Sequence, residues 1–197
     1  MGAPLPSPSH SNGNAQFMSR VVDEAAGLPP KSGMFRLPPE LKAKGDKAEA
    51  DFRAWLNRSG VAFMYVEQSP LTVPEAMRGR IKRPDYLVGV PRTGTLAFDV
   101  KAKTLYEGRL IFDVAELEKQ QRFARMFNLT TLLACLDLER DGYLWWVELT
   151  ELLACKPEWR GKRQVITIEV SKSYAVNTSE LSFLGAVLQY SFRALDA

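Results

Sequence analysis

The feature that most constrains the fold is a pair of nearly continuous apolar runs at residues 130–138 and 143–149, joined by a polar turn. A strand with one wet face alternates apolar and polar residues, whereas a strand that is apolar throughout is covered on both faces. The two runs therefore predict neighbouring strands inside a sheet, with helices packed on both faces of that sheet.

The segments around these runs supply the other layers. Residues 46–59 are predicted to form a helix, because apolar residues recur along one side of it, namely Ala48, Phe52, Trp55 and Leu56. A second helix is expected at residues 114–127. The remaining expected elements are strands at residues 61–67, 84–90, 95–102 and 165–170, a short helix near residue 150 and a last helix at residues 180–195. This order predicts an α/β fold with a mixed central sheet flanked by helices.

The first 44 residues carry few such signals. Residues 1–16 are rich in Pro, Ser, Gly and Asn, so we expect a disordered N-terminal tail. A short helix is expected around residues 18–26, followed by an extended connector at residues 34–44 that contains a Pro-Pro pair. The folded domain is predicted to begin at Gly45, with a core to about residue 155 and a C-terminal addition over residues 156–197.

Counts of single residue types restrict the chemistry. The only histidine, His10, lies in the tail, which disfavours Ser-His-Asp and Cys-His hydrolases, histidine-rich zinc sites and histidine-based ribonucleases. Cys135 and Cys155 lack metal-ligand spacing, and the sequence has no secretory signal or membrane-spanning run. We therefore expect a cytoplasmic protein whose chemistry depends on carboxylates and lysines. The net charge of +3 does not by itself indicate a nucleic-acid partner.

Side chains on a strand alternate between its faces, and this alternation gathers several polar residues. Asp99 and Lys101 share one face of their strand, and the turn expected at residues 91–94 makes a hairpin that brings Asp85 near Asp99. Two close carboxylates repel each other, and a divalent cation such as Mg²⁺ removes that penalty while activating water for hydrolysis. The alternative is that Asp99 and Lys101 form a solvated strand surface without a function.

The residues around this pair resemble a known family. The segments RPDYLV, residues 83–88, and FDVK, residues 98–101, resemble the signature of the PD-(D/E)XK nuclease superfamily. Residues 45–149 are most similar to archaeal Holliday-junction resolvase-type endonucleases. The resemblance implies a restriction-endonuclease-like core and Mg²⁺ or Mn²⁺ as the cofactor. It also implies that Asp85 and Asp99 bind the metal, that Val100 contributes its backbone carbonyl, and that Lys101 acts in catalysis.

The same resemblance implies two further catalytic residues. Glu49 lies on the opening helix, where these nucleases often place an acidic residue that binds metal directly or through water. An equally weighted alternative is a capping box, because Asp46 and Glu49 stand three apart at the expected helix start. Related families also place a glutamine on the second helix. We assign Gln121 to the site, although periodicity does not decide between Gln120 and Gln121.

Two basic stretches are candidates for contact with a phosphate backbone. The first precedes Asp85, and together with a lysine after the motif it gives the expected nucleic-acid-binding residues Arg78, Arg80, Lys82, Arg83 and Lys103. The second stretch, residues 156–163, contains Trp159, which could stack on a base. For this second stretch we expect a solvated face in which Trp159 anchors a loop.

The leading functional hypothesis is a Mg²⁺-dependent endodeoxyribonuclease, with branched DNA as a candidate substrate. A nuclease of a mobile element, a defence system or a delivered toxin would have the same chemistry and is left open. The non-enzymatic alternative is a nucleic-acid-binding module of the same fold. A homodimer is also expected, because resolvase-like enzymes cut two strands with two sites. No membrane partner is expected.

Overall fold

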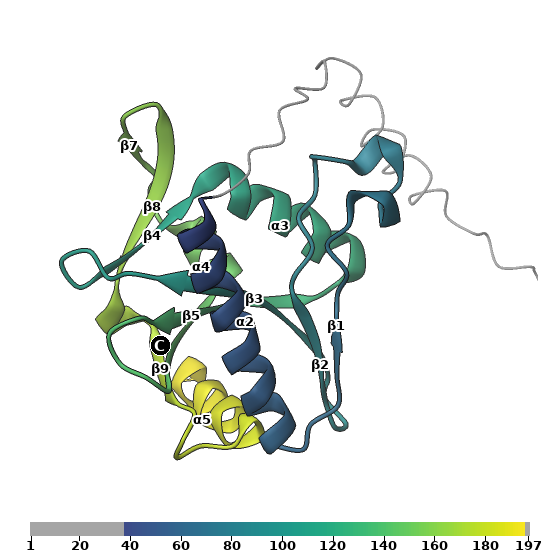
Figure 1. Cartoon of the computed structure of the whole chain (residues 1–197), viewed down its shortest axis with the longest axis vertical. Coiled ribbons are helices and arrows are strands. Elements are labelled where there is room, and N and C mark those ends of the chain that lie inside the picture. Colours follow the sequence, from purple (N-terminus) through teal and green to yellow (C-terminus); the bar gives the residue numbers. More distant parts are fainter. Residues whose placement is uncertain (1–37, 196–197) are drawn as a thin grey trace, which may run out of the picture. The chain divides into compact units, whose positions relative to one another are not determined.

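The computed structural model describes residues 38–195, and the expected helix at residues 18–26 lies outside them. The central sheet has its strands in the order β1–β2–β3–β5–β6–β9 (Figure 1). Their bounds are β1 Phe63–Tyr65, β2 Tyr86–Val90, β3 Gly94–Lys103, β5 Thr130–Asp137, β6 Tyr143–Glu148 and β9 Tyr174–Asn177. β3 and β5 run parallel and all other neighbours run antiparallel, so the sheet is mixed, as predicted.

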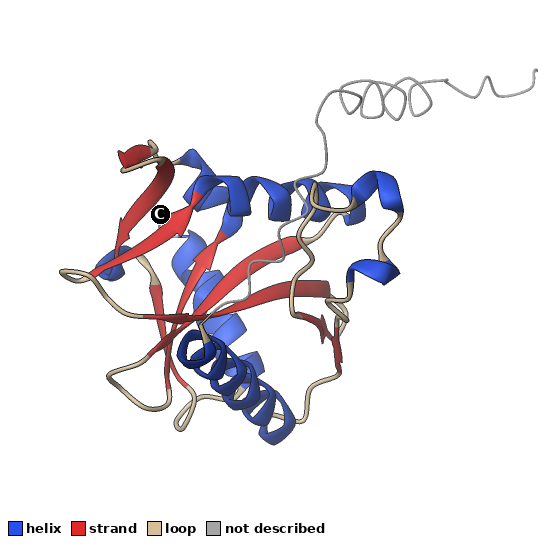
Figure 2. Cartoon of the chain, turned by 45° about the horizontal axis from the view of Figure 1, so that its top comes forward, coloured by secondary structure: helices blue, strands red, loops and turns tan. Residues whose placement is uncertain are grey.

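Helices cover both faces of this sheet. α2 (Pro39–Arg58) and α5 (Phe183–Leu195) pack on one face, and α3 (Val114–Phe127) and α4 (Leu149–Ala154) pack on the other (Figures 1 and 2). The predicted α/β fold class is therefore confirmed, and α3 has the bounds that the sequence predicts. No helix among residues 38–195 is both long and apolar enough to cross a bilayer.

The two apolar strands supply two separate cores. Leu132 of β5 joins the core under α2 and α5, whereas the next residue, Leu133, joins the core under α3 and α4. Trp146 and Trp145 of β6 divide in the same way. Successive residues thus pack on opposite faces, which explains why both runs are apolar almost throughout. Phe98 of β3 is fully buried in the first core, and truncating such a ring to Ala costs about 3–5 kcal/mol.

A second, three-stranded sheet has the order β4–β8–β7. Its strands are β4 (Arg109–Asp113), β8 (Arg163–Glu169) and β7 (Glu158–Arg160), and the β7–β8 hairpin projects from the body of the domain (Figures 1 and 2). Of these strands the sequence predicts only β8. Short 3-10 helices lie at η1 Pro70–Thr72, η2 Glu75–Met77 and η3 Val170–Lys172.

The first described helix begins earlier than the sequence predicts. α2 starts at Pro39 rather than at Asp46, so the prediction of an extended connector is wrong for residues 39–44. Pro39 occupies the first helical position, where its fixed φ favours a helix and its missing N–H is not needed. One turn further on, the ion pair between Lys42 and Asp46, at 2.9 Å, supports the helix across Gly45.

Candidate active site

Asp85 and Asp99 lie beside each other on adjacent strands. The antiparallel register pairs Tyr86 with Phe98, which places the preceding Asp85 opposite Asp99. The Asp85 backbone N–H donates to the Phe98 carbonyl at 2.8 Å, so the chain is held in register one residue before β2. Both carboxylates are buried, with 8% of Asp85 and none of Asp99 exposed. The hairpin thus brings together the two acidic residues that strand alternation singles out.

The Asp85 carboxyl group is strongly perturbed by this environment. Burial raises the pKa of Asp85 to about 7, and the negative charge of Asp99 adds to that effect. A hydrogen bond from the Val100 N–H to Asp85 Oδ2, at 2.7 Å, acts in the opposite direction because it stabilises the carboxylate. The Asp85 carboxyl group therefore titrates near neutral pH, and a bound cation would favour its ionised form.

Asp99 lies between two lysines. Lys101 Nζ is 2.9 Å from Asp99 Oδ2, and Lys82 Nζ is 3.1 Å from Asp99 Oδ1. Neither contact has hydrogen-bond geometry, so both buried oxygens of Asp99 lack a hydrogen bond from any residue in the described range. The charge of Asp99 is neutralised while its lone pairs remain available, a combination that suits a carboxylate able to accept a metal ion.

The two lysines are tied together by Glu116, which the sequence analysis does not single out. The carboxylate of Glu116 contacts the ammonium groups of both Lys82 and Lys101. Burial would raise the pKa of Glu116, but the two ammonium groups outweigh it and lower that pKa to about 2. Burial would likewise lower the pKa of Lys101, and the charges of Asp99 and Glu116 outweigh it, so the pKa of Lys101 is raised.

The position of Glu116 follows from the start of α3. The Asp113 side chain caps this helix by accepting hydrogen bonds from the Ala115 and Glu116 N–H groups at 2.9 and 3.3 Å. The cap fixes the first turn, in which Glu116 faces the lysines. An Asp followed three residues later by a Glu is a helix-start signal in the sequence, so Asp113 and Glu116 could have been recognised as one. The sequence gives no sign that Glu116 reaches Lys82.

The glutamine near the site is Gln120, and the choice of Gln121 is wrong in this respect. Gln120 is 2% exposed and lines a cavity of about 10 Å³ together with Lys101 and Glu116, whereas Gln121 is only half-buried. Neither the oxygen nor the nitrogen of the Gln120 amide has a hydrogen-bond partner among the described residues. The cavity is just large enough for one water molecule, which the amide could orient beside Lys101.

Glu49 lies half-buried on α2, and the charges of Asp99 and Lys101 act on its carboxyl group. Burial raises the pKa of Glu49, and the charges of Asp46 and Asp99 raise it further. The capping-box alternative is wrong, because α2 begins at Pro39 and Asp46 lies inside it. Across residues 38–195, no group of three or more His, Cys, Asp or Glu side chains is arranged to hold a metal ion. Asp85 and Asp99 are therefore the two acidic residues that the β2–β3 hairpin places side by side.

The predicted nucleic-acid-binding residues separate into different roles. Lys82 belongs to the cluster around Asp99, as described above. Arg78 donates to the Pro70 and Val73 carbonyls at 3.2 and 3.3 Å, and thereby holds its own loop. Arg80 lies half-buried beside α3, where its carbonyl accepts a hydrogen bond from Arg122 at 3.2 Å.

The other two members of that set also contact the protein itself. Arg83 donates to Thr72 Oγ1 and to the Ser69 carbonyl, which fixes the start of η1. Lys103 donates to the Ile111 carbonyl at 2.6 Å and lies 4.9 Å from the centre of the Phe112 ring. Burial lowers the pKa of Lys103. In this structure the Lys103 ammonium group is thus held by the chain itself, and its contact with a phosphate backbone stays a prediction.

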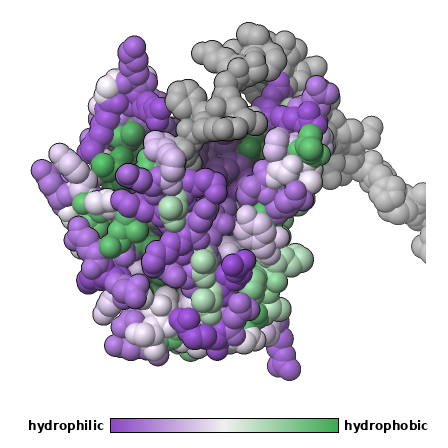
Figure 3. All heavy atoms as spheres, in the orientation of Figure 1, coloured by the Kyte–Doolittle hydropathy of each residue, from purple (hydrophilic) through white to green (hydrophobic). Residues whose placement is uncertain are grey.

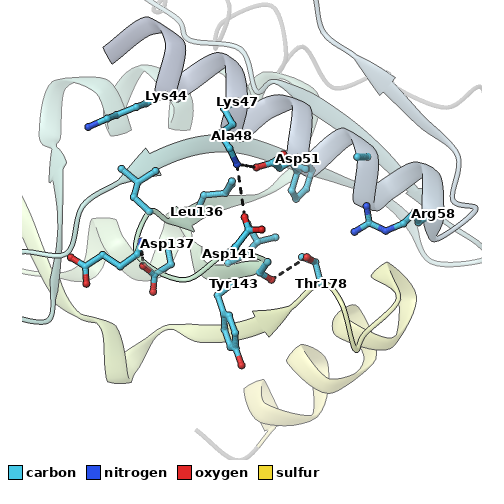
Figure 4. A pocket seen from close by; sticks show the side chains of 16 residues that line it. Lys44, Lys47, Ala48, Asp51, Arg58, Leu136, Asp137, Asp141, Tyr143 and Thr178 are labelled. Carbon is cyan, nitrogen blue, oxygen red and sulfur yellow. Dashed lines mark hydrogen bonds and ion pairs between the residues drawn. The ribbon is translucent and has the colours of Figure 1, made fainter. Parts of the chain in front are cut away.

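A larger groove, with a volume of about 460 Å³, lies elsewhere, between α2 and the turn that joins β5 to β6 (Figure 4). Several of its charged side chains form ion pairs. Lys47 pairs with Asp51 at 2.6 Å and with Asp141 at 3.9 Å, and Asp137 pairs with Arg140 at 2.9 Å. None of the predicted site residues lines this groove, so we assign no chemistry to it.

The chain resembles known proteins in structure but not in sequence. No family model matches the chain, and no curated protein matches it in sequence. In structure the chain is similar to Hjc, a Holliday junction resolvase from the archaeal hyperthermophile Archaeoglobus fulgidus, with 22% identity, a TM-score of 0.46, and coverage of 71% of this chain and 95% of that one. It is also similar to D212, a nuclease from a fusselovirus, with 12% identity, a TM-score of 0.38, and coverage of 84% and 99%.

Both TM-scores lie below 0.5. The architecture agrees with what the PD-(D/E)XK resemblance implies. Pro84 and Asp85 immediately precede β2, and Asp99 and Lys101 lie on the neighbouring strand β3. The mixed sheet with helices on both faces holds these residues at one place.

Proposed function

We propose that this chain is a metal-dependent nuclease that hydrolyses phosphodiester bonds in DNA. The observation that carries the proposal is the buried pair of Asp85 and Asp99, with the ammonium groups of Lys101 and Lys82 within 3.1 Å of Asp99. A solvated strand surface would not bury two carboxyl groups and hold two ammonium groups beside them, because removing charged groups from water is costly. The two free cysteines suit a reducing cytoplasm.

The residues present fit a divalent metal. Asp85 and Asp99 would hold Mg²⁺ or Mn²⁺ with their carboxylates, and Val100 would contribute its backbone carbonyl. The unfilled lone pairs of Asp99 and the raised pKa of Asp85 both favour a cation at this position. When bound, such a metal polarises the phosphate and lowers the pKa of a bound water. Glu49 on α2 would add a further negative charge to the site.

The remaining residues position charge around the scissile phosphate. Lys101 would stabilise the negative charge that develops on the phosphate oxygens, since an ammonium in a buried site acts strongly on a nearby anion. Glu116 would hold Lys101 in place through their ion pair. Gln120 would orient a water molecule in the small cavity beside Lys101.

DNA would approach along the loop that precedes β2. Arg78, Arg80 and Arg83 bring positive charge to this loop, and guanidinium groups bind phosphate oxygens well. We propose branched DNA as the first substrate to examine. A homodimer would supply two sites for two strands, and the exposed stripe of Leu184, Leu188 and Phe192 on α5 is a suitable apolar surface for it.

The test is a cleavage panel with supercoiled, linear and branched DNA in Mg²⁺, Mn²⁺ or EDTA. Wild type is expected to cut only with metal, and Asp99→Asn is expected to reduce the rate at least about 100-fold, corresponding to about 3 kcal/mol or more. The matched control is Asp137→Asn, since Asp137 is another buried aspartate but lies away from the site. Equal cleavage by wild type and Asp99→Asn would refute the proposal.

A further inference from the structure

The β7–β8 hairpin presents an aromatic residue that the rest of the fold does not use. Trp159 is 69% exposed, so the expectation that it anchors a loop is wrong. The other three tryptophans, Trp55, Trp145 and Trp146, are at most 9% exposed. An indole on the surface leaves a large apolar face in water, and such a face is typical of a contact surface.

The hairpin is also basic, and its positive charge is largely unopposed. Residues 156–163 contain four basic residues and one acidic residue, Glu158. Glu158 pairs with Arg160 at 3.0 Å. Within the described part of the chain, Lys156, Lys162 and Arg163 have no acidic partner at ion-pair distance. The projecting end of the hairpin, at the upper left of Figure 3, is hydrophilic.

A second exposed aromatic residue lies near a cation of the hairpin. Tyr106 is 60% exposed, and the Arg160 guanidinium lies 6.0 Å from the centre of its ring. Arg160 therefore lies next to Trp159 in sequence and next to Tyr106 in space, while strand alternation points the Trp159 and Arg160 side chains to opposite faces of β7. Aromatic faces interleaved with cations are the combination that binds single-stranded nucleic acid, because bases stack on the rings while cations contact phosphates.

The hairpin is joined firmly to the candidate active site. β8 pairs with β4 over five residue pairs, from Arg109–Glu169 to Asp113–Val165. Asp113 then caps α3, whose first turn carries Glu116. β4 thus leads from the sheet that contains the hairpin directly into α3 (Figures 1 and 2). A strand of nucleic acid held by the hairpin would thus have a fixed position relative to the site.

We propose that the β7–β8 hairpin binds unpaired nucleotides of a nucleic-acid strand. Trp159 stacks on a base, and Lys156, Lys162 and Arg163 contact the phosphates. Unpaired rather than duplex nucleotides fit this surface, since the bases of a duplex already stack on one another and offer no free face inside the helix. The proposal deepens the proposed nuclease function by giving its substrate a single-stranded or branched segment, and it rests on that function only for its biological role.

The experiment uses the exposure of Trp159 as a probe. The full-length chain carrying Asp99→Asn is titrated in EDTA with a 20-nucleotide oligo(dT) and with a 20-base-pair duplex, while tryptophan fluorescence is recorded. Since the other three tryptophans are buried, oligo(dT) is expected to quench the emission of Trp159. The variant Trp159→Phe in the same background is expected to show no quenching.

Affinity is measured separately with fluorescein-labelled oligo(dT) by anisotropy. Trp159→Ala is expected to weaken binding about 5- to 150-fold, the range that loss of one stacked base produces. Lys162→Ala/Arg163→Ala is expected to lower the slope of log affinity against log salt by about 1.4. The matched controls are Phe127→Ala, an exposed aromatic residue at the end of α3, and Lys44→Ala/Lys172→Ala, which removes two exposed charges elsewhere.

The outcomes separate this proposal from the nuclease proposal. Loss of affinity in the hairpin variants but not in the controls supports it, even if wild type cleaves nothing. Unchanged affinity for oligo(dT) in Trp159→Ala overturns it, even if wild type is an active nuclease. A shift of Trp159→Ala from dimer to monomer in analytical ultracentrifugation, with oligo(dT) binding intact, also overturns it and assigns the surface to a second copy of the chain.

Discussion

The ammonium nitrogen of Lys82 lies 3.1 Å from Asp99 Oδ1, whereas Lys101 contacts the other carboxylate oxygen, Oδ2. Lys82 belongs to the loop before β2, whereas Lys101 follows Asp99 on the same face of β3. A fully buried carboxylate needs nearby positive charge to offset the loss of water. Two lysines from different segments supply that positive charge to Asp99.

Lys82→Met is expected to tighten the binding of Mn²⁺. Lys82 places a positive charge beside Asp99, and a cation in that position opposes a divalent metal that binds the same carboxylate. Its removal leaves Lys101 to neutralise Asp99 in the absence of metal. We expect the Kd for Mn²⁺, measured by isothermal titration calorimetry, to fall about tenfold, which corresponds to about 1.4 kcal/mol. Arg78→Met, which removes an exposed charge from the same loop, is the control and is expected to leave that Kd unchanged; weaker binding by Lys82→Met would contradict the prediction.

The raised pKa of Asp85 predicts that the metal-free protein loses stability as the pH rises from about 4 to about 7. In this window the folded state keeps a proton on Asp85 that the unfolded chain has released, so the stabilisation is complete below about 3.8 and is lost as pH passes through about 7. The loss is expected to be on the order of a few kcal/mol. It is measured by urea unfolding in EDTA at a series of pH values.

The control for this pH effect is Asp85→Asn. The amide oxygen still accepts the hydrogen bond from the Val100 N–H, but the side chain no longer titrates. We expect the fall between pH 4 and 7 to become shallower in this variant. The same fall in wild type and Asp85→Asn would assign the effect to another group.

Glu116→Gln is expected to reduce both stability and acid resistance. The Glu116 carboxylate contacts the ammonium groups of Lys82 and Lys101, and its removal leaves Asp99 as their nearest negative charge. Because the Glu116 side chain is 39% exposed, water screens the pair and we expect a loss of only about 1 kcal/mol at pH 7.

Acid resistance should change in a defined window. The pKa of Glu116 is lowered to about 2, so its contribution is present above about 4.5 and is lost as pH falls through 2. The variant should therefore lack this dependence, as followed by circular dichroism during acid titration. Glu118→Gln, which removes an exposed partner of Arg122 at 3.7 Å, should change stability by less than about 0.5 kcal/mol. An effect of Glu118→Gln as large as that of Glu116→Gln would contradict the prediction.

Local patterns in the sequence determine much of the fold. The apolar runs predict β5 and β6, and the periodicity of residues 114–127 predicts α3, because burial on two faces and a helical period both leave a signal within a few residues. β7 and β9 have three and four residues, and β9 is held by its pairing with β6, so their own sequence carries little signal. The start of α2 at Pro39 is missed because a Pro-Pro pair is read as a connector.

The contacts of the site are also predictable only where they are local in the sequence. Strand alternation brings Asp85 to Asp99, since both lie on one hairpin whose register is local. Lys82 and Glu116 stand 34 positions apart, and their contact exists only because the loop before β2 packs on α3. The choice between Gln120 and Gln121 likewise depends on which side of α3 faces β3, and the periodicity of one helix does not report that.

Gln120→Met is expected to raise stability while lowering cleavage. The Gln120 amide is buried without a hydrogen-bond partner among the described residues, and burying an unpaired amide costs free energy that an apolar side chain of similar size does not. We expect the free energy of unfolding to rise by about 1 kcal/mol, as measured in urea.

Cleavage should fall about tenfold or more, since the amide would no longer orient water beside Lys101. Gln121→Met is the matched control one residue away, and it should leave cleavage unchanged. If Gln120→Met were less stable than wild type, the expected gain in stability would be wrong.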